Sequence, residues 1–322
     1  MAGAAFLAVP AEASVVAVNS KEMNTVCMGR HQMDLPREFE QNLGSISIFE
    51  PHALPESGAP ISVALKADRI APDAFKLEVD KRHAKIKELQ REQTDVLREV
   101  IHVGKDMIIF RVMEIDDAYT SELHLWKGGA YIVATSDSYD NTFMQAEERL
   151  LAFAANIDVA ARPTPGGFCL GPVVIRGDYK GEGGRLSFRS VKAPDMRLTV
   201  SIDTYERDSS QSLLERMLRD NSLLKRLSGN YKVLRKREFQ VAGMRAQEWL
   251  GWAMLGKQGE HKSYGFALET LRASPGPMQP KIFMEFKTGK QGGIATLPDS
   301  ALSDAEATEI WDGIVKSIRE RP

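Results

Sequence analysis

Hydrophobic and polar residues alternate along short stretches of this chain, a pattern typical of β-strands with one buried face. Residues 45–49 and 197–202 alternate in this way. Further strands are predicted at residues 30–35, 98–104, 107–112, 122–126, 131–135, 185–190, 237–243, 247–252, 264–269 and 281–286. Antiparallel strands joined by short turns therefore dominate the prediction.

A helical spacing of apolar residues occurs four times. One segment starts at Pro72 and carries apolar residues up to Val96, and another follows Ser210 and is rich in leucine up to Leu227. The other two close each half of the chain. They begin at Thr142 and Ser303, which are followed three residues later by Gln or Glu and so fit a capping box.

The order strands, helix, strands, helix occurs twice. Residues 25–29 and 167–171 each place a cysteine two residues before a glycine, and the two halves end at Pro163 and Pro322. The sequence therefore predicts an α+β protein with two tandem similar domains, each an antiparallel sheet packed against about two helices. We place a tail at residues 1–23, an N-terminal domain at 24–163 and a C-terminal domain at 164–322, with a Pro/Gly-rich linker around 161–167.

The two halves carry opposite charge. Residues 1–163 contain 17 Lys and Arg against 25 Asp and Glu, a net charge of −8, and the remainder has 25 against 19, a net of +6. Nucleic-acid-binding proteins usually present one basic face, so the acidic first half argues against that class. Halves of opposite sign either attract each other or present two different faces to a partner.

Cys27 and Cys169 are the only cysteines of the chain. Two cysteines are too few for a disulfide framework or a zinc site. A Cys27–Cys169 bridge would require the starts of the two predicted domains to touch. We therefore expect both residues to be small buried hydrophobic side chains.

The first 13 residues have a short apolar run and an Ala-x-Ala ending at Ala13, as at the end of a secretory signal, but lack its positively charged beginning. They are predicted to be either a remnant export signal or a small-residue tail. No stretch approaches the ~20 apolar residues of a membrane span, so we expect a soluble protein.

Motifs of catalysis are absent from the sequence: there is no nucleophile elbow, no Cys-x-x-Cys and no His-Glu-x-x-His. His102 and His124 lie on strands predicted to be adjacent and could face each other. Two imidazoles are too few for a metal site, so we interpret them as ordinary strand residues. We expect no catalytic, metal-binding or cofactor-binding residue.

Two glycine-rich segments look like phosphate loops but lack essential parts. Residues 251–257 have the spacing up to Lys257, and Gln258 then replaces the hydroxyl residue that would hold Mg²⁺. Residues 181–184 lack the third glycine of a dinucleotide loop. Both segments are predicted to be turns. The basic run from Arg216 to Arg245 is most simply a solvated surface, with phosphate binding or docking of an acidic partner as alternatives.

Several segments resemble a known family. Residues 25–30 leading into 34–36, residues 165–169, 241–248 and the closing 310–322 are similar to immunity proteins that neutralise lipase effectors of the type VI secretion system, specifically the fourth lipase-immunity class. The resemblance runs from about residue 24 to the end, and its closing segment is the most specific part.

The resemblance implies a non-enzymatic, two-domain protein of the bacterial periplasm. It would bind one cognate secreted lipase of the α/β-hydrolase type as a 1:1 complex, grip the lid region and block the active site. We expect no nucleic-acid partner and no stable membrane insertion. The alternatives are an enzyme with a dispersed phosphate-handling site in the basic second half, and a module that binds an anionic ligand.

Tyr119, Trp126 and Trp252 are the candidate partner-binding residues, because tyrosine and tryptophan near loop tips are common anchors of protein interfaces. The alternative for the tryptophans is that they belong to the core of the sheet.

Overall fold

A computed structural model describes residues 22–52, 59–91, 96–115, 117–160, 166–205, 211–219, 230–255, 261–272, 274–289 and 299–321. Every strand pairing among these residues is antiparallel. Helices pack on the sheets, so the predicted α+β class is confirmed. No helix in the described part of the chain is long and apolar enough to cross a membrane.

The first half runs from strand to helix twice. Its elements are β1 (Met23–Met28), β2 (His31–Pro36), β3 (Phe39–Asn42), β4 (Ile46–Glu50), β5 (Ile61–Ala67), α1 (Pro72–Arg91), β6 (Val96–Val103), β7 (Met107–Ile115), β8 (Ala118–Lys127), β9 (Ala130–Tyr139), the 3-10 turn η1 (Asp140–Thr142), α2 (Phe143–Ala155) and β10 (Ile157–Val159).

The second half follows nearly the same order. Its elements are β11 (Phe168–Leu170), β12 (Val173–Ile175), β13 (Gly181–Ser190), β14 (Arg197–Asp203), α3 (Leu213–Leu218), β15 (Tyr231–Val241), β16 (Met244–Leu255), β17 (His261–Thr270), β18 (Lys281–Thr288), α5 (Asp304–Lys316) and β19 (Arg319–Glu320).

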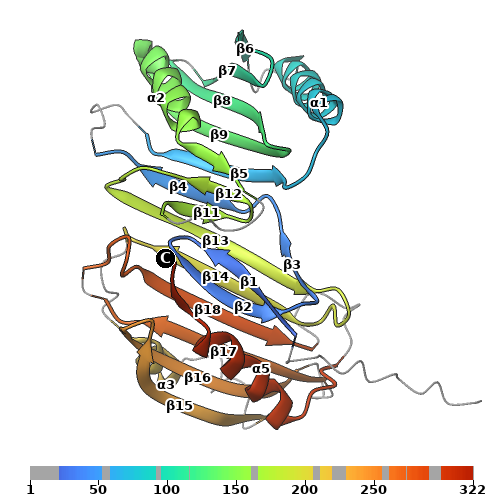
Figure 1. Ribbon diagram of the computed structural model, residues 1–322, viewed down its shortest axis with the longest axis vertical. Helices are drawn as coiled ribbons and strands as arrows, with labels where there is room; N and C mark the ends of the chain where they lie inside the picture. Colours follow the sequence, from blue (N-terminus) through green and yellow to red (C-terminus); the bar gives the residue numbers. More distant parts are fainter. Residues whose placement is uncertain are drawn as a thin grey trace, which may run out of the picture.

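Strands of both halves form one 13-stranded sheet. Its order is β15-β16-β17-β18-β14-β13-β4-β5-β9-β8-β7-β6, with β3 also beside β13 (Figure 1). The halves meet where β4 pairs with β13, with Ile48 opposite Gly183. The sheets predicted for the two halves are thus continuous with each other.

Two small sheets exchange strands between the halves. β19, the last strand of the second half, pairs with the opening hairpin of the first half in the order β1-β2-β19. In the same way β10 pairs with the opening hairpin of the second half in the order β10-β12-β11. Each half therefore completes a sheet of the other, and the limits 24–163 and 164–322 stay a prediction for independent folding units.

The inner face of the large sheet is the side covered by α2, α5 and the two small sheets, which Figure 1 shows toward the viewer. A continuous apolar core lies there and joins residues of both halves, among them Phe49, Phe153, Phe266 and Trp311. Burial of this core, at about 25 cal/mol per Å² of apolar surface, drives the association of the two halves.

The outer face is the opposite side of the large sheet. At one end α1 packs on Phe110 and Tyr131 of the first half. At the other end α3 lies on β16, where the backbone N–H of Leu214 donates to the Gln247 side chain at 3.0 Å. Neighbouring residues of a strand point to opposite faces of the sheet. The strand residues that pack against α1 and α3 are therefore not the ones that form the inner core.

The helix starts were predicted in part. Ser303 and Glu306 form a capping box at α5, as expected. Thr142 does not cap α2, because it ends the η1 turn with φ −87° and ψ 2° and donates its hydroxyl to the Tyr139 carbonyl instead. The capping box Ser212–Glu215 at α3 was not predicted. In the first half α1 ends at Arg91, and Val96 already begins β6.

Residues 181–184 were predicted to be a turn, and this is wrong. They begin β13, and the glycines serve packing rather than reversal of the chain. A Cβ at Gly181 would lie 2.1 Å from the Tyr205 ring, so only glycine leaves room for this ring. Residues 251–255 of the other glycine-rich segment belong to β16, so the turn predicted there is wrong as well. The predicted tail, most of the linker, residues 256–258, and Lys225 and Arg226 of the basic run lie outside the described residues.

Candidate functional site

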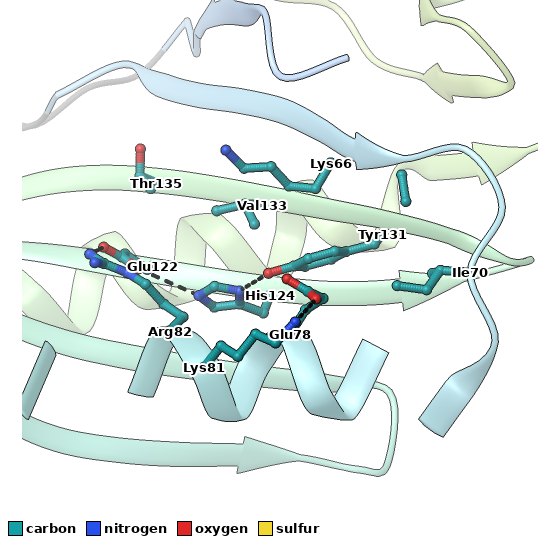
Figure 2. Close-up of a pocket in the computed structure, with 11 residues that line it drawn as sticks. Lys66, Ile70, Glu78, Lys81, Arg82, Glu122, His124, Tyr131, Val133 and Thr135 are labelled. Atoms are coloured by element: carbon teal, nitrogen blue, oxygen red, sulfur yellow. Dashed lines mark hydrogen bonds and ion pairs between the residues drawn. The ribbon is translucent and has the colours of Figure 1, made fainter. Parts of the chain in front are cut away.

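A pocket of about 780 Å³ opens on the outer face between α1 and the sheet (Figure 2). Its lining comes from α1, β5, β8 and β9, which the fold brings together from residues 66–135. The polar floor consists of Arg82 on α1, Glu122 and His124 on β8, and Tyr131 on β9.

Arg82 holds the carboxylate of Glu122 with two hydrogen bonds. Its Nε donates to Oε2 at 2.9 Å, and Nη2 donates to Oε1. Burial alone would raise the pKa of Glu122, but hydrogen bonds from Arg82 and His124 outweigh it and lower the pKa to about 2. Glu122 is therefore a carboxylate throughout the physiological pH range.

His124 connects this ion pair to Tyr131. Its Nδ1 lies 2.7 Å from the Tyr131 hydroxyl and its Nε2 lies 3.4 Å from Glu122 Oε2. Burial, with the charges of Glu78 and Glu122, raises the pKa of Tyr131 to about 12. His102 and His124 were expected on adjacent strands, and this is wrong, because β7 lies between their strands, with Ile108 opposite both histidines.

The polar side chains of this pocket form one connected network. A general acid or base works with a pKa near the operating pH, and neither Glu122 nor Tyr131 has one. The described lining contains no serine or cysteine beside the histidine. The network instead ties α1 to β8 and leaves a rigid polar floor at one end of the outer face.

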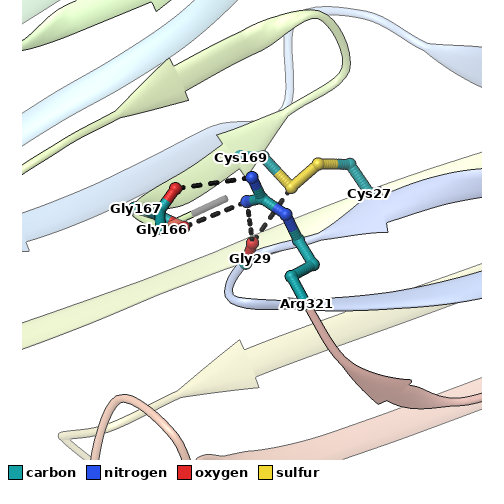
Figure 3. Close-up of a disulfide and its surroundings, with 6 residues drawn as sticks. All are labelled: Cys27, Gly29, Gly166, Gly167, Cys169 and Arg321. Atoms are coloured by element: carbon teal, nitrogen blue, oxygen red, sulfur yellow. Dashed lines mark hydrogen bonds between the residues drawn. A yellow bond between two sulfur atoms is a disulfide. The ribbon is translucent and has the colours of Figure 1, made fainter. Parts of the chain in front are cut away.

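The two halves are joined covalently in a second polar centre (Figure 3). Cys27 of β1 and Cys169 of β11 form a disulfide with a Cα–Cα distance of 5.9 Å, within the usual range. The expectation of two unbridged hydrophobic cysteines was therefore wrong. Its premise fails because the opening hairpins of the halves do touch, with Cys169 N donating to the Gly29 carbonyl at 3.0 Å.

The C-terminal segment closes the same junction. The Arg321 guanidinium donates to the carbonyls of Gly29 at 3.3 Å and Gly167 at 3.0 Å (Figure 3). Nearby, Arg30 Nε donates to the buried Glu182 at 2.6 Å and so crosses between the halves again. Chain segments around residues 27–30, 166–169 and 321 thus form one rigid joint.

The family described as Tle cognate immunity protein 4 C-terminal domain matches residues 161–322, just over half of the chain. The chain belongs to this family. The match confirms the resemblance seen in the second half of the sequence. No curated protein sequence matches the chain.

Solved structures of immunity proteins share the fold of both halves. The apo form of TplEi, a T6SS immunity protein of Pseudomonas aeruginosa, has a TM-score of 0.66 and 22% identity, with 95% of this chain and 99% of that one covered. TplEi complexed with an "L" peptide gives 0.65 at 22% identity, covering 94% and 100%. A chain of the Tle4-Tli4 complex gives 0.64 at 22% identity, covering 93% and 98%.

In this immunity protein the three predicted anchor residues lie apart from one another. Tyr119 is half-buried on β8 with its ring 5.2 Å from that of Phe143. Trp126 is half-buried against the α1 cluster and donates its Nε1 to the Ile70 carbonyl at 2.9 Å. Both are strand residues rather than loop tips.

Trp252 belongs to the second half and packs partly against the main core, with Lys262 Nζ 5.1 Å from the centre of its ring. Its indole Nε1 is buried and has no hydrogen-bond partner. As anchors for a partner, Tyr119, Trp126 and Trp252 stay predictions. The outer-face pocket, which the sequence reasoning missed, had one local signal, the Glu122-x-His124 alternation on one strand.

Proposed function

We propose that this chain is an immunity protein that binds a cognate secreted lipase of the α/β-hydrolase type as a 1:1 complex and holds it inactive. The observation that carries this proposal is the family match over residues 161–322. A fold shared over 95% of the chain with a T6SS immunity protein supports it. One structural relative is described in a complex, Tle4-Tli4, as expected for a protein that acts by binding.

Inhibition by contact needs a rigid binder, and the junction between the halves supports one. The exchanged strands, the disulfide and Arg321 fix the two halves before a partner arrives. Rigid surfaces lose little conformational entropy on association, which favours tight binding. We propose that the two halves grip the lid region of the lipase, because a lipase that cannot open cannot admit lipid.

We propose a periplasmic location and no enzymatic activity. A disulfide buried between the halves supports an oxidising compartment, since cytosolic proteins rarely retain such bonds. The alternative of a phosphate-handling enzyme is less well supported. In the basic run, Arg235 and Arg237 are occupied by ion pairs to the buried Glu248.

Co-expression with the lipase encoded beside this protein tests the proposal. We expect the two chains to co-purify as a 1:1 complex and the lipase activity to fall by more than 90%, a loss that requires roughly tenfold excess over Kd. An unrelated secreted lipase serves as the control and should keep its activity. Full activity of the neighbouring lipase in the presence of excess protein would refute the function.

A further inference from the structure

The middle of the outer face is open among the described residues. α1 lies over one end of the sheet and α3 over the other, while β4, β13, β14 and β18 between them present half-exposed or exposed side chains. Arg185 and Arg189 of β13 are exposed, and Thr199 and Glu285 of the next two strands are half-exposed. We call the outer face of β4, β13, β14 and β18 the open floor. It lies between α1 and α3 and faces away from the core.

Three cations stand side by side on this floor. Arg189 of β13 is directly opposite Arg197 of β14, and Arg197 is directly opposite Lys287 of β18. Adjacent strands lie ~4.8 Å apart, so the three Cα positions fall within about 10 Å. Like charges directly opposite each other destabilise a sheet, so the row stands out from ordinary cross-strand pairing.

Carboxylates lie beside the row at three positions. Lys287 Nζ lies 3.1 Å from Glu285, and Arg189 faces Glu40 of β3 in the register while its Nε donates to the Pro194 carbonyl at 3.1 Å. The Nε of Arg197 is buried and has no hydrogen-bond partner. A third carboxylate, the buried Asp195, lies two residues before Arg197 and accepts from the Gly289 N–H at 2.8 Å.

Beyond Lys287 the described residues leave space beside the row. Gly265 of β17 is paired with Lys287, and a Cβ at this glycine would meet no atom within 4 Å. A partner's backbone or a small side chain can therefore reach the sheet beside the lysine.

Apolar side chains occupy the neighbouring part of the same floor. In β4 the usual alternation is inverted, because Ser47 and Phe49 are buried while Ile46 and Ile48 are 58% and 41% exposed. Two exposed isoleucines on a strand in the middle of a large sheet are costly, since each keeps apolar surface in water. Gly183, opposite Ile48, adds no side chain that would cover it.

We propose that this open floor binds the cognate lipase, with Ile46 and Ile48 taking an apolar part of its surface and the row Arg189–Arg197–Lys287 taking its carboxylates. Gly183 and Arg189 are six residues apart on β13, or about 20 Å, which fits a standard interface of about 800 Å² per partner. Apolar contacts beside the cations favour an amphipathic protein surface over a phosphate ligand. The inference rests on the proposed function and adds the surface and the chemistry of the partner.

A charge reversal tests the row. We expect Arg189→Glu/Lys287→Glu to slow association with the neighbouring-gene lipase about tenfold or more at low salt, and the difference to shrink at high salt, because steering charges act through the rate of encounter. The neutral pair Arg189→Gln/Lys287→Gln should give a smaller loss of the same kind. Ile48→Asp should instead speed dissociation, by roughly tenfold.

The matched control is Lys105→Glu/Lys316→Glu, which changes the charge equally at exposed sites on the β6–β7 turn and on α5. Unfolding midpoints of all variants report whether each one folds. If the wild-type protein binds the lipase and the row variants bind as well as the control, the inference is wrong while the function stands. If the row variants lose binding to DNA or to phosphatidylglycerol vesicles but not to the lipase, the row serves a phosphate ligand and the inference also fails.

Discussion

The two halves share their strand order and apolar core but fix their closing helices differently. In the first half Arg111 on β7 donates twice to Glu147 on α2, at 2.7 and 2.8 Å. In the second half Arg235 of β15 forms an ion pair with Asp312 on α5, and the fully buried Glu248 of β16 accepts from Arg235 at 2.6 Å and from the Trp311 indole of α5 at 3.0 Å. Both halves thus pair an arginine of the sheet with an acid of the closing helix, and the second half adds a buried acid on the sheet that also binds the helix.

This difference indicates which features the repeated fold requires. Apolar residues at strand and helix spacing recur in both halves, because they build the shared inner core. The buried acid under the closing helix, Glu248, does not recur, since a buried charge is tolerated wherever its own partners surround it. Such freedom allows one half to be acidic and the other basic with no change of architecture.

Removal of the bond that joins the halves should have the largest effect. Cys27 and Cys169 are 142 residues apart, and a loop of this size constrains the unfolded chain by about 5 kcal/mol. We expect Cys27→Ala/Cys169→Ala to lower the free energy of unfolding by about that amount in urea titrations.

Reductant gives the control for this prediction. It should lower the midpoint of the wild-type protein once the thiols are released, and it should leave the midpoint of the double variant unchanged. Equal stability of the oxidised protein and the double variant would show that strand exchange alone holds the halves together.

Loss of the ionic contacts that hold the closing helices α2 and α5 should have the next largest effect on stability. Glu248→Gln removes the fully buried counter-charge of Arg235 and Arg237, although Arg235 keeps Asp312 on α5, and such a loss typically costs about 3 kcal/mol. Glu147→Gln should cost less, about 1–3 kcal/mol, because Arg111 keeps Glu99 at 2.6 Å and the side chain of Glu147 is 9% exposed. Urea unfolding of both variants measures the difference, and equal losses would mean that the additional buried acid on the sheet adds no stability.

The local hydrophobic pattern predicted the long strands and the helices at 72–91, 143–155 and 304–316, because the periodicity of these elements shows within a short stretch of sequence. The strands β10 and β19, of three and two residues, are too short to show a period. The disulfide and the row Arg189–Arg197–Lys287 depend on strand register between residues up to 142 positions apart. No local sequence pattern specifies such a register. The junction between the halves and the open floor could therefore be recognised only in the folded structure.

The smallest expected effect concerns how the closing helices begin. Ser303 accepts from the Glu306 N–H at 3.2 Å, so Ser303→Ala should lower stability by about 1 kcal/mol, as is typical for loss of an N-cap. Thr142 caps nothing, and Thr142→Ala should cost less than about 0.5 kcal/mol, since only the bond to the Tyr139 carbonyl is lost. Chemical denaturation of the two variants compares them. Equal costs would mean that the η1 turn supports α2 as strongly as a capping box supports α5, and that the halves differ in the form of their helix starts but not in strength.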